Sequence, residues 1–225
     1  MCFSAEASFG ASALISVMGV FAIKKANSVP LKIFAIIPLF FAFQQLMEGF
    51  LWIVINNPDY QVWKHSLIIG FLIFAWLVWP VYVPFSMAML EKNATKRKVL
   101  LGFLVIGIIL TFGFLYILIF HKIDASAAKL HIHYSLDYVP PLEWIYGLIY
   151  LIPTIVSMMV SSVKKMWILG LINLASYIFS RIFFFGHVLS VWCFFGALAS
   201  GFVLWYVIQM SKVHETSEET INQTV

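Results

Sequence analysis

The stretch VLLGFLVIGIILTFGFLYILIF, residues 99–120, decides the class of this protein. Its 22 residues contain no charged side chain. A helix needs about 20 such residues to cross roughly 30 Å of hydrocarbon. Because lipid offers the backbone no hydrogen-bond partners, a continuous apolar run of this length predicts a transmembrane helix.

Apolar runs of similar length recur along the whole chain. The protein has 225 residues, of which 62% are hydrophobic and 11% charged, whereas a soluble domain carries about 25% charged residues. One small soluble domain could not keep so much apolar surface out of water. We therefore predict an all-α integral membrane bundle of about seven transmembrane helices, near residues 5–23, 31–55, 66–90, 99–120, 142–161, 166–185 and 187–210.

The third of these spans carries Pro80 and Pro84, which predict a kink because proline has no backbone N–H to donate. We expect residues 1–210 to form a single transmembrane domain and residues 211–225 to form a polar cytoplasmic tail.

The basic residues indicate an orientation. If the N-terminus lies outside, the cytoplasmic side receives ten Lys and Arg residues, and the outer side receives Lys64, Lys122, Lys129 and Arg181. This bias predicts an outer N-terminus and a cytoplasmic C-terminus in the cytoplasmic (inner) membrane of the cell. Because the net charge of +4 sits in clusters between apolar runs, we expect the lipid bilayer, and no nucleic acid, as a partner.

The second predicted span contains an unusual acidic residue, Glu48, about two helical turns inside its outer end. Gln44, Gln45 and Trp52 lie on the same or an adjoining helix face. Ionisable residues inside a membrane are costly and therefore point to function. We predict Glu48 as a general base or metal ligand, with Gln44, Gln45 and Trp52 binding substrate.

Other ionisable residues fall toward the same outer side. Glu6 begins the first span, Glu143 the fifth and His187 the seventh, and Arg181 lies near the outer end of the sixth. Together with polar stripes on the fifth and sixth spans, they predict an outward-facing polar pocket. We assign Glu6 and His187 to catalysis, Arg181 and Glu143 to substrate binding, and any divalent metal to Glu48 and His187.

Cys2 is a further catalytic candidate. Removal of the initiator Met would expose a residue that carries both an α-amino group and a thiol, close to the positive end of the first helix dipole. The alternatives are a small residue at the membrane interface or an acylation site.

A structural explanation competes with each functional one. The polar stripes can simply join helices through hydrogen bonds, and Ser4 can cap a helix whose dipole favours Glu6. Glu48 and Arg181 can form a buried ion pair. The residues His131 and His133 can belong to a wet loop rather than to a metal site.

Three segments resemble a family of uncharacterised bacterial multi-pass membrane proteins: MCFSAEASF, IPLFFAFQQLMEGFLW and HVLSVWCFFGALAS. Members start with a Met-Cys-Phe-Ser-Ala-like sequence and carry Gln-Gln…Glu-Gly…Trp in the second helix. The resemblance covers most of the chain and implies a shared fold, but no established activity. It draws attention to Cys2, Ser4, Gln44, Gln45, Glu48, Gly49, Trp52, Trp192 and Cys193.

Three functions remain open. The first is a membrane-embedded, metal-dependent hydrolase acting on a lipid or amide. Seven-helix alkaline ceramidases resemble this chain in helix number. Their last helix carries a pair of histidines, however, whereas the last span here has His187 alone. The second is a transporter or sensor of a small solute, and the third is a non-catalytic scaffold. A retinal protein is excluded, because the last span lacks a Schiff-base lysine.

Overall fold

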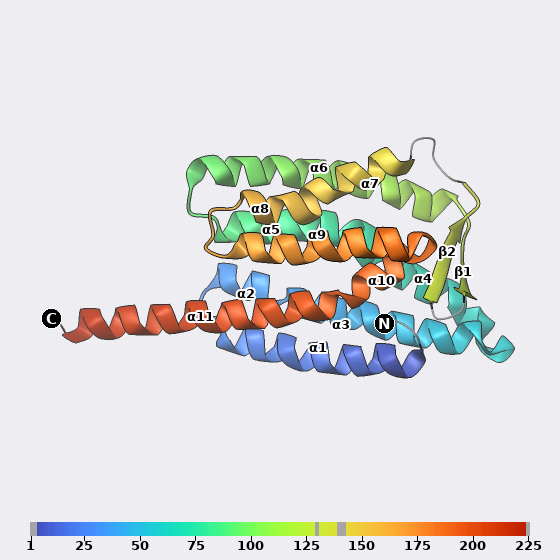
Figure 1. The fold of residues 1–225 in the computed structure, drawn as a ribbon, viewed down its shortest axis with the longest axis horizontal. Coiled ribbons are helices and arrows are strands. Elements are labelled where there is room, and N and C mark those ends of the chain that lie inside the picture. The colour runs from blue at the N-terminus through green and yellow to red at the C-terminus, as the bar shows by residue number, and fades with distance from the viewer. Residues whose placement is uncertain (1–3, 129–130, 139–142, 224–225) are drawn as a thin grey trace.

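The computed structural model describes residues 4–128, 131–138 and 143–223 as an elongated helical bundle (Figure 1). Among them, six helical segments are long and apolar enough to cross a membrane, and the fifth predicted span, 142–161, corresponds to a shorter apolar helix, Trp144–Val160. The six are Ala5–Lys25, Val29–Ile55, Pro58–Leu90, Ala94–Phe120, Met166–Phe183 and Val188–Lys212. The predicted all-α membrane bundle is confirmed.

Most predicted spans consist of more than one helix. Only α1 (Ala5–Lys25), α6 (Ala94–Phe120) and α9 (Met166–Phe183) are unbroken. The remaining spans are divided into α2 (Val29–Ala35) and α3 (Ile37–Ile55); η1 (Pro58–Trp63), α4 (Lys64–Leu72), η2 (Ile73–Val78) and α5 (Trp79–Leu90); α7 (Glu143–Leu151), η3 (Ile152–Val156) and α8 (Ser157–Val160); and η4 (Phe185–His187), α10 (Val188–Phe194) and α11 (Gly196–Gln223).

The proline-containing third span is irregular, because the π-helical segment η2 directly precedes the helix that contains Pro80 and Pro84. Pro84 cannot donate to the carbonyl of Pro80, four residues earlier. A Cβ atom on Gly107 of α6 would lie 1.8 Å from that carbonyl oxygen, so only glycine lets α6 approach it. Thr111 of α6 also donates a hydrogen bond to the Leu77 carbonyl at 3.1 Å. Gly107 and Thr111 therefore let α6 pack closely against the backbone carbonyl groups of Pro80 and Leu77.

A β-hairpin covers one end of the bundle, where the sequence had indicated only a loop (Figure 1). Strands β1 (Ile123–Ala128) and β2 (His131–Leu136) are antiparallel, with Ile123 opposite Leu136. The side chains of Ile123, Ala125 and Ile132 are buried against α3 and α4, so their burial fixes the hairpin to the bundle. We call this the hairpin end.

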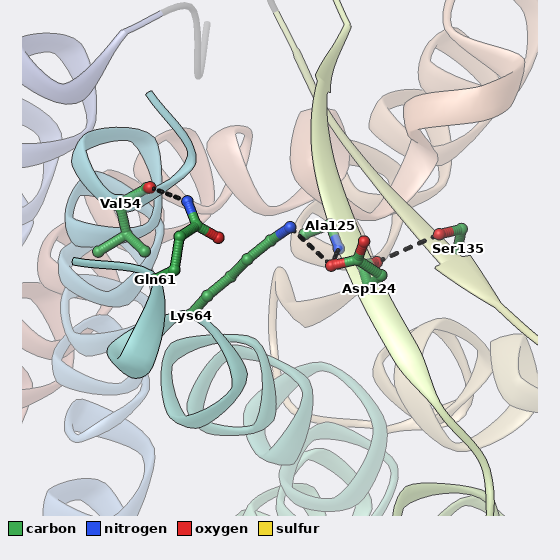
Figure 2. A network of polar contacts seen from close by, with 6 residues as sticks. All are labelled: Val54, Gln61, Lys64, Asp124, Ala125 and Ser135. Atoms are coloured by element: carbon green, nitrogen blue, oxygen red, sulfur yellow. Dashed lines mark hydrogen bonds and ion pairs between the residues drawn. The ribbon is translucent and has the colours of Figure 1, made fainter. Parts of the chain in front are cut away.

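A polar contact adds to this attachment (Figure 2). Lys64, at the start of α4, places its Nζ 2.7 Å from the Oδ1 of Asp124 in β1. The same carboxylate accepts a hydrogen bond from the backbone N–H of Ala125 at 2.8 Å. The Lys64 ammonium lowers the pKa of Asp124. Because the carboxylate is largely exposed, water screens this ion pair and its contribution to stability is small.

The opposite end is closed by Glu91, which follows α5. Its carboxylate accepts hydrogen bonds from the Ser161 hydroxyl at 2.9 Å, the Ser162 backbone N–H at 2.6 Å and the Ser162 hydroxyl. The backbone N–H of Asn93 donates a further one at 2.9 Å. One carboxylate thus joins the loop between α5 and α6 to the loop between α8 and α9. We call this the Glu91 end.

Candidate functional site

A cluster of buried polar side chains surrounds Glu48 on α3. Its carboxylate is fully buried, and it accepts hydrogen bonds from the Ser190 hydroxyl of α10 and from Gln45 Nε2 at 3.4 Å. The side chains of Gln45 and Ser190 are also fully buried. A carboxylate enclosed by donors from two helices joins those helices firmly, because losing either partner would leave a polar atom unsatisfied in an apolar interior.

Gln44, on the neighbouring face of α3, makes a second contact with α10 and extends this polar core to α5. Its Nε2 donates a hydrogen bond to the Cys193 sulfur of α10 at 3.0 Å. Its Oε1 accepts one from Trp79 Nε1 of α5 at 3.0 Å. Gln44 therefore fixes the positions of a thiol and an indole ring.

Those two groups form part of the wall of a cavity in the middle of the bundle. Among the described residues, sixteen line it, and the space that protein atoms leave empty is about 690 Å³, counting the part open to the surroundings. The wall is largely aliphatic and aromatic and carries no charged side chain. Its lining comes from α2, α3, η2, α5, α7, η3, α8, α9, α10 and α11, with aromatic side chains from Phe34, Phe41, Trp79, Tyr150 and Trp192.

Irregular backbone borders this cavity. The π-helical segments η2 and η3 supply Ala75 and Thr154 to its wall. In η2 the hydrogen bonds span five residues, as in the bond from Trp79 N–H to the Phe74 carbonyl, so the next carbonyl, Ala75, would need an N–H from Pro80, which has none. The Tyr150 hydroxyl donates to it instead, at 2.5 Å. Single π-helical turns of this kind occur often at functional sites.

Three histidines meet at the hairpin end. The ring of His187 lies 5.4 Å from that of His131 and 5.6 Å from that of His133, between ring centroids. His133 Nδ1 donates to the Gly186 carbonyl at 2.7 Å, which ties β2 to η4. Burial and the neighbouring His187 lower the pKa of His131, and burial and His133 lower that of His187.

These histidines do not form a metal site with the residues that surround them. In the described part of the chain, no group of three or more His, Cys, Asp or Glu side chains is arranged to hold a metal ion. The two predicted ligands have different partners: Glu48 contacts Gln45 and Ser190, whereas His187 packs against His131 and His133.

The remaining predicted site residues are scattered. Cys2 and the side chain of Glu143 lie outside the described residues. Glu6 is exposed in the first turn of α1, and Ser4 caps that helix by accepting from the Ala7 N–H at 3.2 Å. Trp52 is buried near the hairpin end. Arg181 is half-buried in the last turn of α9.

The predicted polar stripes are partly directed inward. Tyr150 and Thr154 on the fifth span and Asn173 on the sixth line the cavity, but Tyr146 is exposed. Several stripe residues bond within their own helix, since Ser176, Ser180 and Asn173 each donate to the carbonyl four residues earlier. Sequence reasoning missed Ser190 and Trp79. The spacing of Ser190 from His187, one helical turn, was the available signal for the former.

The comparisons with known proteins place the chain in a family but add no activity. No curated protein and no solved structure matches the chain. A family model does match, over residues 1–218, which is nearly the whole chain. The protein therefore belongs to DUF6629, a family of unknown function.

Proposed function

We propose that this membrane protein binds a membrane-soluble small molecule in its central cavity. One observation carries the proposal: an uncharged, aromatic-rich cavity lies inside an apolar bundle, beside a polar core that fixes its wall. Ligand sites are typically concave and mostly apolar, with a few polar groups placed by the protein. A molecule dissolved in the bilayer would exchange lipid contacts for these aromatic side chains.

The same geometry weakens the hydrolase hypothesis that the sequence raised for Glu48. A general base must come within hydrogen-bond reach of its substrate. Glu48 is fully buried, is not among the cavity-lining residues and already accepts from Ser190 and Gln45. The arrangement favours Glu48 as a structural residue that positions α3 against α10.

Movement of the bound molecule across the membrane is a second candidate function, supported by η2 and η3. Irregular backbone in a membrane is tolerated where it is buried or lines a cavity, and transporters place broken helices at their binding sites. Flux of a cavity ligand in proteoliposomes would distinguish a transporter from a binding protein. Binding without any flux would leave the first proposal in place and reject the second.

We also propose that the hairpin end faces the outside of the cytoplasmic membrane and that the Glu91 end faces the cytoplasm. The support is the excess of Lys and Arg residues at the Glu91 end, including Lys92, Lys96 and Lys98. A membrane-impermeant amine reagent applied to intact cells should therefore label Lys122 and leave Lys96 unmodified; the reverse pattern would overturn this orientation.

Cavity binding is tested with a neutral aromatic diazirine photoprobe on the full chain in lipid nanodiscs. We expect saturable labelling of the peptide that contains Trp192 and Cys193. Ala199→Leu, which adds atoms to the cavity wall, should reduce that labelling severalfold. Ala13→Leu adds the same atoms at an exposed position of α1 and serves as the control. Labelling that never saturates, or that Ala199→Leu leaves unchanged, would reject the proposal.

A further inference from the structure

The hydrogen bonds of the cavity wall indicate the chemistry of the ligand. Most polar groups in the wall are already engaged inside the protein. Trp79 donates to Gln44, the Tyr150 hydroxyl donates to the Ala75 carbonyl, and the Thr154 hydroxyl donates to the Tyr150 carbonyl at 2.7 Å. These groups maintain the shape of the cavity.

Trp192 differs from them. Its indole Nε1–H has no hydrogen-bond acceptor among the described residues, although the ring itself is held edge-to-face by Tyr150 and Tyr177, with centroids 6.1 and 5.3 Å away. An indole nitrogen can only donate. Trp192 is half-buried. An indole donor that faces apolar surroundings without an acceptor costs free energy, which an acceptor on a ligand would recover.

Asn173 provides a second group with unused capacity. Its Nδ2 donates to the Leu169 carbonyl at 2.9 Å, which uses one of the two N–H groups of the amide. The other N–H has no acceptor among the described residues. Both Asn173 and Trp192 line the cavity, so the wall offers donors to a bound molecule from two different helices.

The sixteen lining residues also decide the charge of the ligand. None of them is Asp, Glu, Lys, Arg or His. An ion transferred into such a site would lose its hydration without gaining a counter-ion, which is strongly unfavourable. The wall can therefore hold a neutral molecule far better than a fatty acid anion or a phospholipid head group.

We infer that the cavity selects a neutral, mainly apolar molecule with a carbonyl oxygen, of the ketone or quinone class, which accepts hydrogen bonds from Trp192 and Asn173. This inference rests on the proposed function, because it names the ligand class of the same cavity. The aromatic side chains of Phe41 and Trp79, stacked with centroids 4.2 Å apart, line the same cavity and add flat apolar surface to its wall.

The test compares three molecules of equal chain length as competitors of the photoprobe in nanodiscs: methyl nonyl ketone, undecane and undecanoate. The ketone should displace the probe at about fivefold lower membrane concentration than undecane, the advantage expected of one net hydrogen bond. Undecanoate, kept ionised at pH 8, should be the weakest competitor.

Two variants test whether Trp192 and Asn173 cause the advantage of the ketone over undecane. Trp192→Phe and Asn173→Leu should each reduce the advantage of the ketone while saturable probe labelling persists. Trp144→Phe, at an exposed position of α7, is the matched control and should keep the advantage.

The outcomes separate this inference from the proposed function. Saturable labelling with equal competition by ketone and undecane would overturn the ligand class but keep cavity binding. Strongest competition by undecanoate would overturn the requirement for a neutral molecule. An advantage that survives both substitutions would overturn the assigned donors, and absence of saturable labelling would overturn both proposals together.

Discussion

The polar core around Glu48 and the central cavity meet at Gln44, and they differ in how completely the protein pairs their polar atoms. In the core, the Glu48 carboxylate, the Ser190 hydroxyl and the Gln44 amide have partners inside the protein. In the cavity wall, Trp192 Nε1–H has no acceptor among the described residues. The difference teaches that a buried polar residue in a membrane bundle indicates ligand binding only where the protein leaves its hydrogen-bonding capacity unused.

The strongest challenge to this comparison is Glu48→Leu. It would leave the Ser190 hydroxyl and the Gln45 amide without their acceptor, and two such groups should lower the free energy of unfolding by about 4 kcal/mol. Glu48→Gln retains an acceptor oxygen and should cost much less. Reversible unfolding by sodium dodecyl sulfate in mixed micelles measures both. If Glu48→Leu were as stable as the wild type but failed to bind a ligand, Glu48 would belong to the binding site and the comparison would fail.

Glu91 extends the comparison to a carboxylate that is also held by several hydrogen bonds but follows the candidate membrane span Pro58–Leu90. Its burial acts to raise its pKa, but hydrogen bonds from Ser162, Asn93 and Ser161 outweigh burial and bring the pKa to about 2. Because the ordinary pKa is 4.5, the stabilisation is complete above pH 4.5 and is lost as the pH falls toward 2.

We therefore expect the protein to lose stability between pH 5 and pH 2.5 in detergent. Glu91→Gln should reduce the stability by about 2 kcal/mol at neutral pH and flatten this acid dependence. A variant with an unchanged acid dependence would show that other carboxylates control it.

The histidines of the hairpin end should give a smaller effect in the same direction, at higher pH. Since the pKa values of His131 and His187 are lowered in the folded protein, the neutral forms stabilise the fold above the ordinary pKa of 6.5. That stabilisation declines as the pH falls through the lowered values.

Hydrogen exchange should therefore be severalfold faster in β2 at pH 5 than at pH 7.5, after correction for intrinsic rates, and unchanged in α5. His131→Phe should weaken this pH dependence. Equal protection of β2 at both pH values would mean that the histidines do not fix the hairpin to η4.

The helix positions were predictable from the sequence because lipid imposes one strict requirement, a long run of apolar residues with its backbone satisfied internally. The same argument could not show where helices break. The interruption at Phe195 between α10 and α11 lies inside a continuous apolar run, so hydropathy gives no signal there. The hairpin was missed because its strands are short and carry few large apolar residues that could be recognised as buried, such as Ile123 and Ile132.

The candidate site was predictable in part. Glu48 and Gln44 stand out in any apolar span, but sequence alone could not tell that their partners would be Ser190, Cys193 and Trp79, which are distant in the chain. Nor could it distinguish a polar core from a pocket, since both need inward-facing polar residues. The cavity lies beside Gln44 rather than at Glu48, and that placement follows from packing between helices.

The most direct test of cavity binding is native mass spectrometry of the protein extracted gently from its own membrane. We predict one bound neutral molecule of a single mass on the wild type and on Ala13→Leu, and its loss from Ala199→Leu. Adducts of mixed phospholipid masses that are equal in all three proteins would contradict the account, because they would place the bound molecules on the outer surface of the bundle.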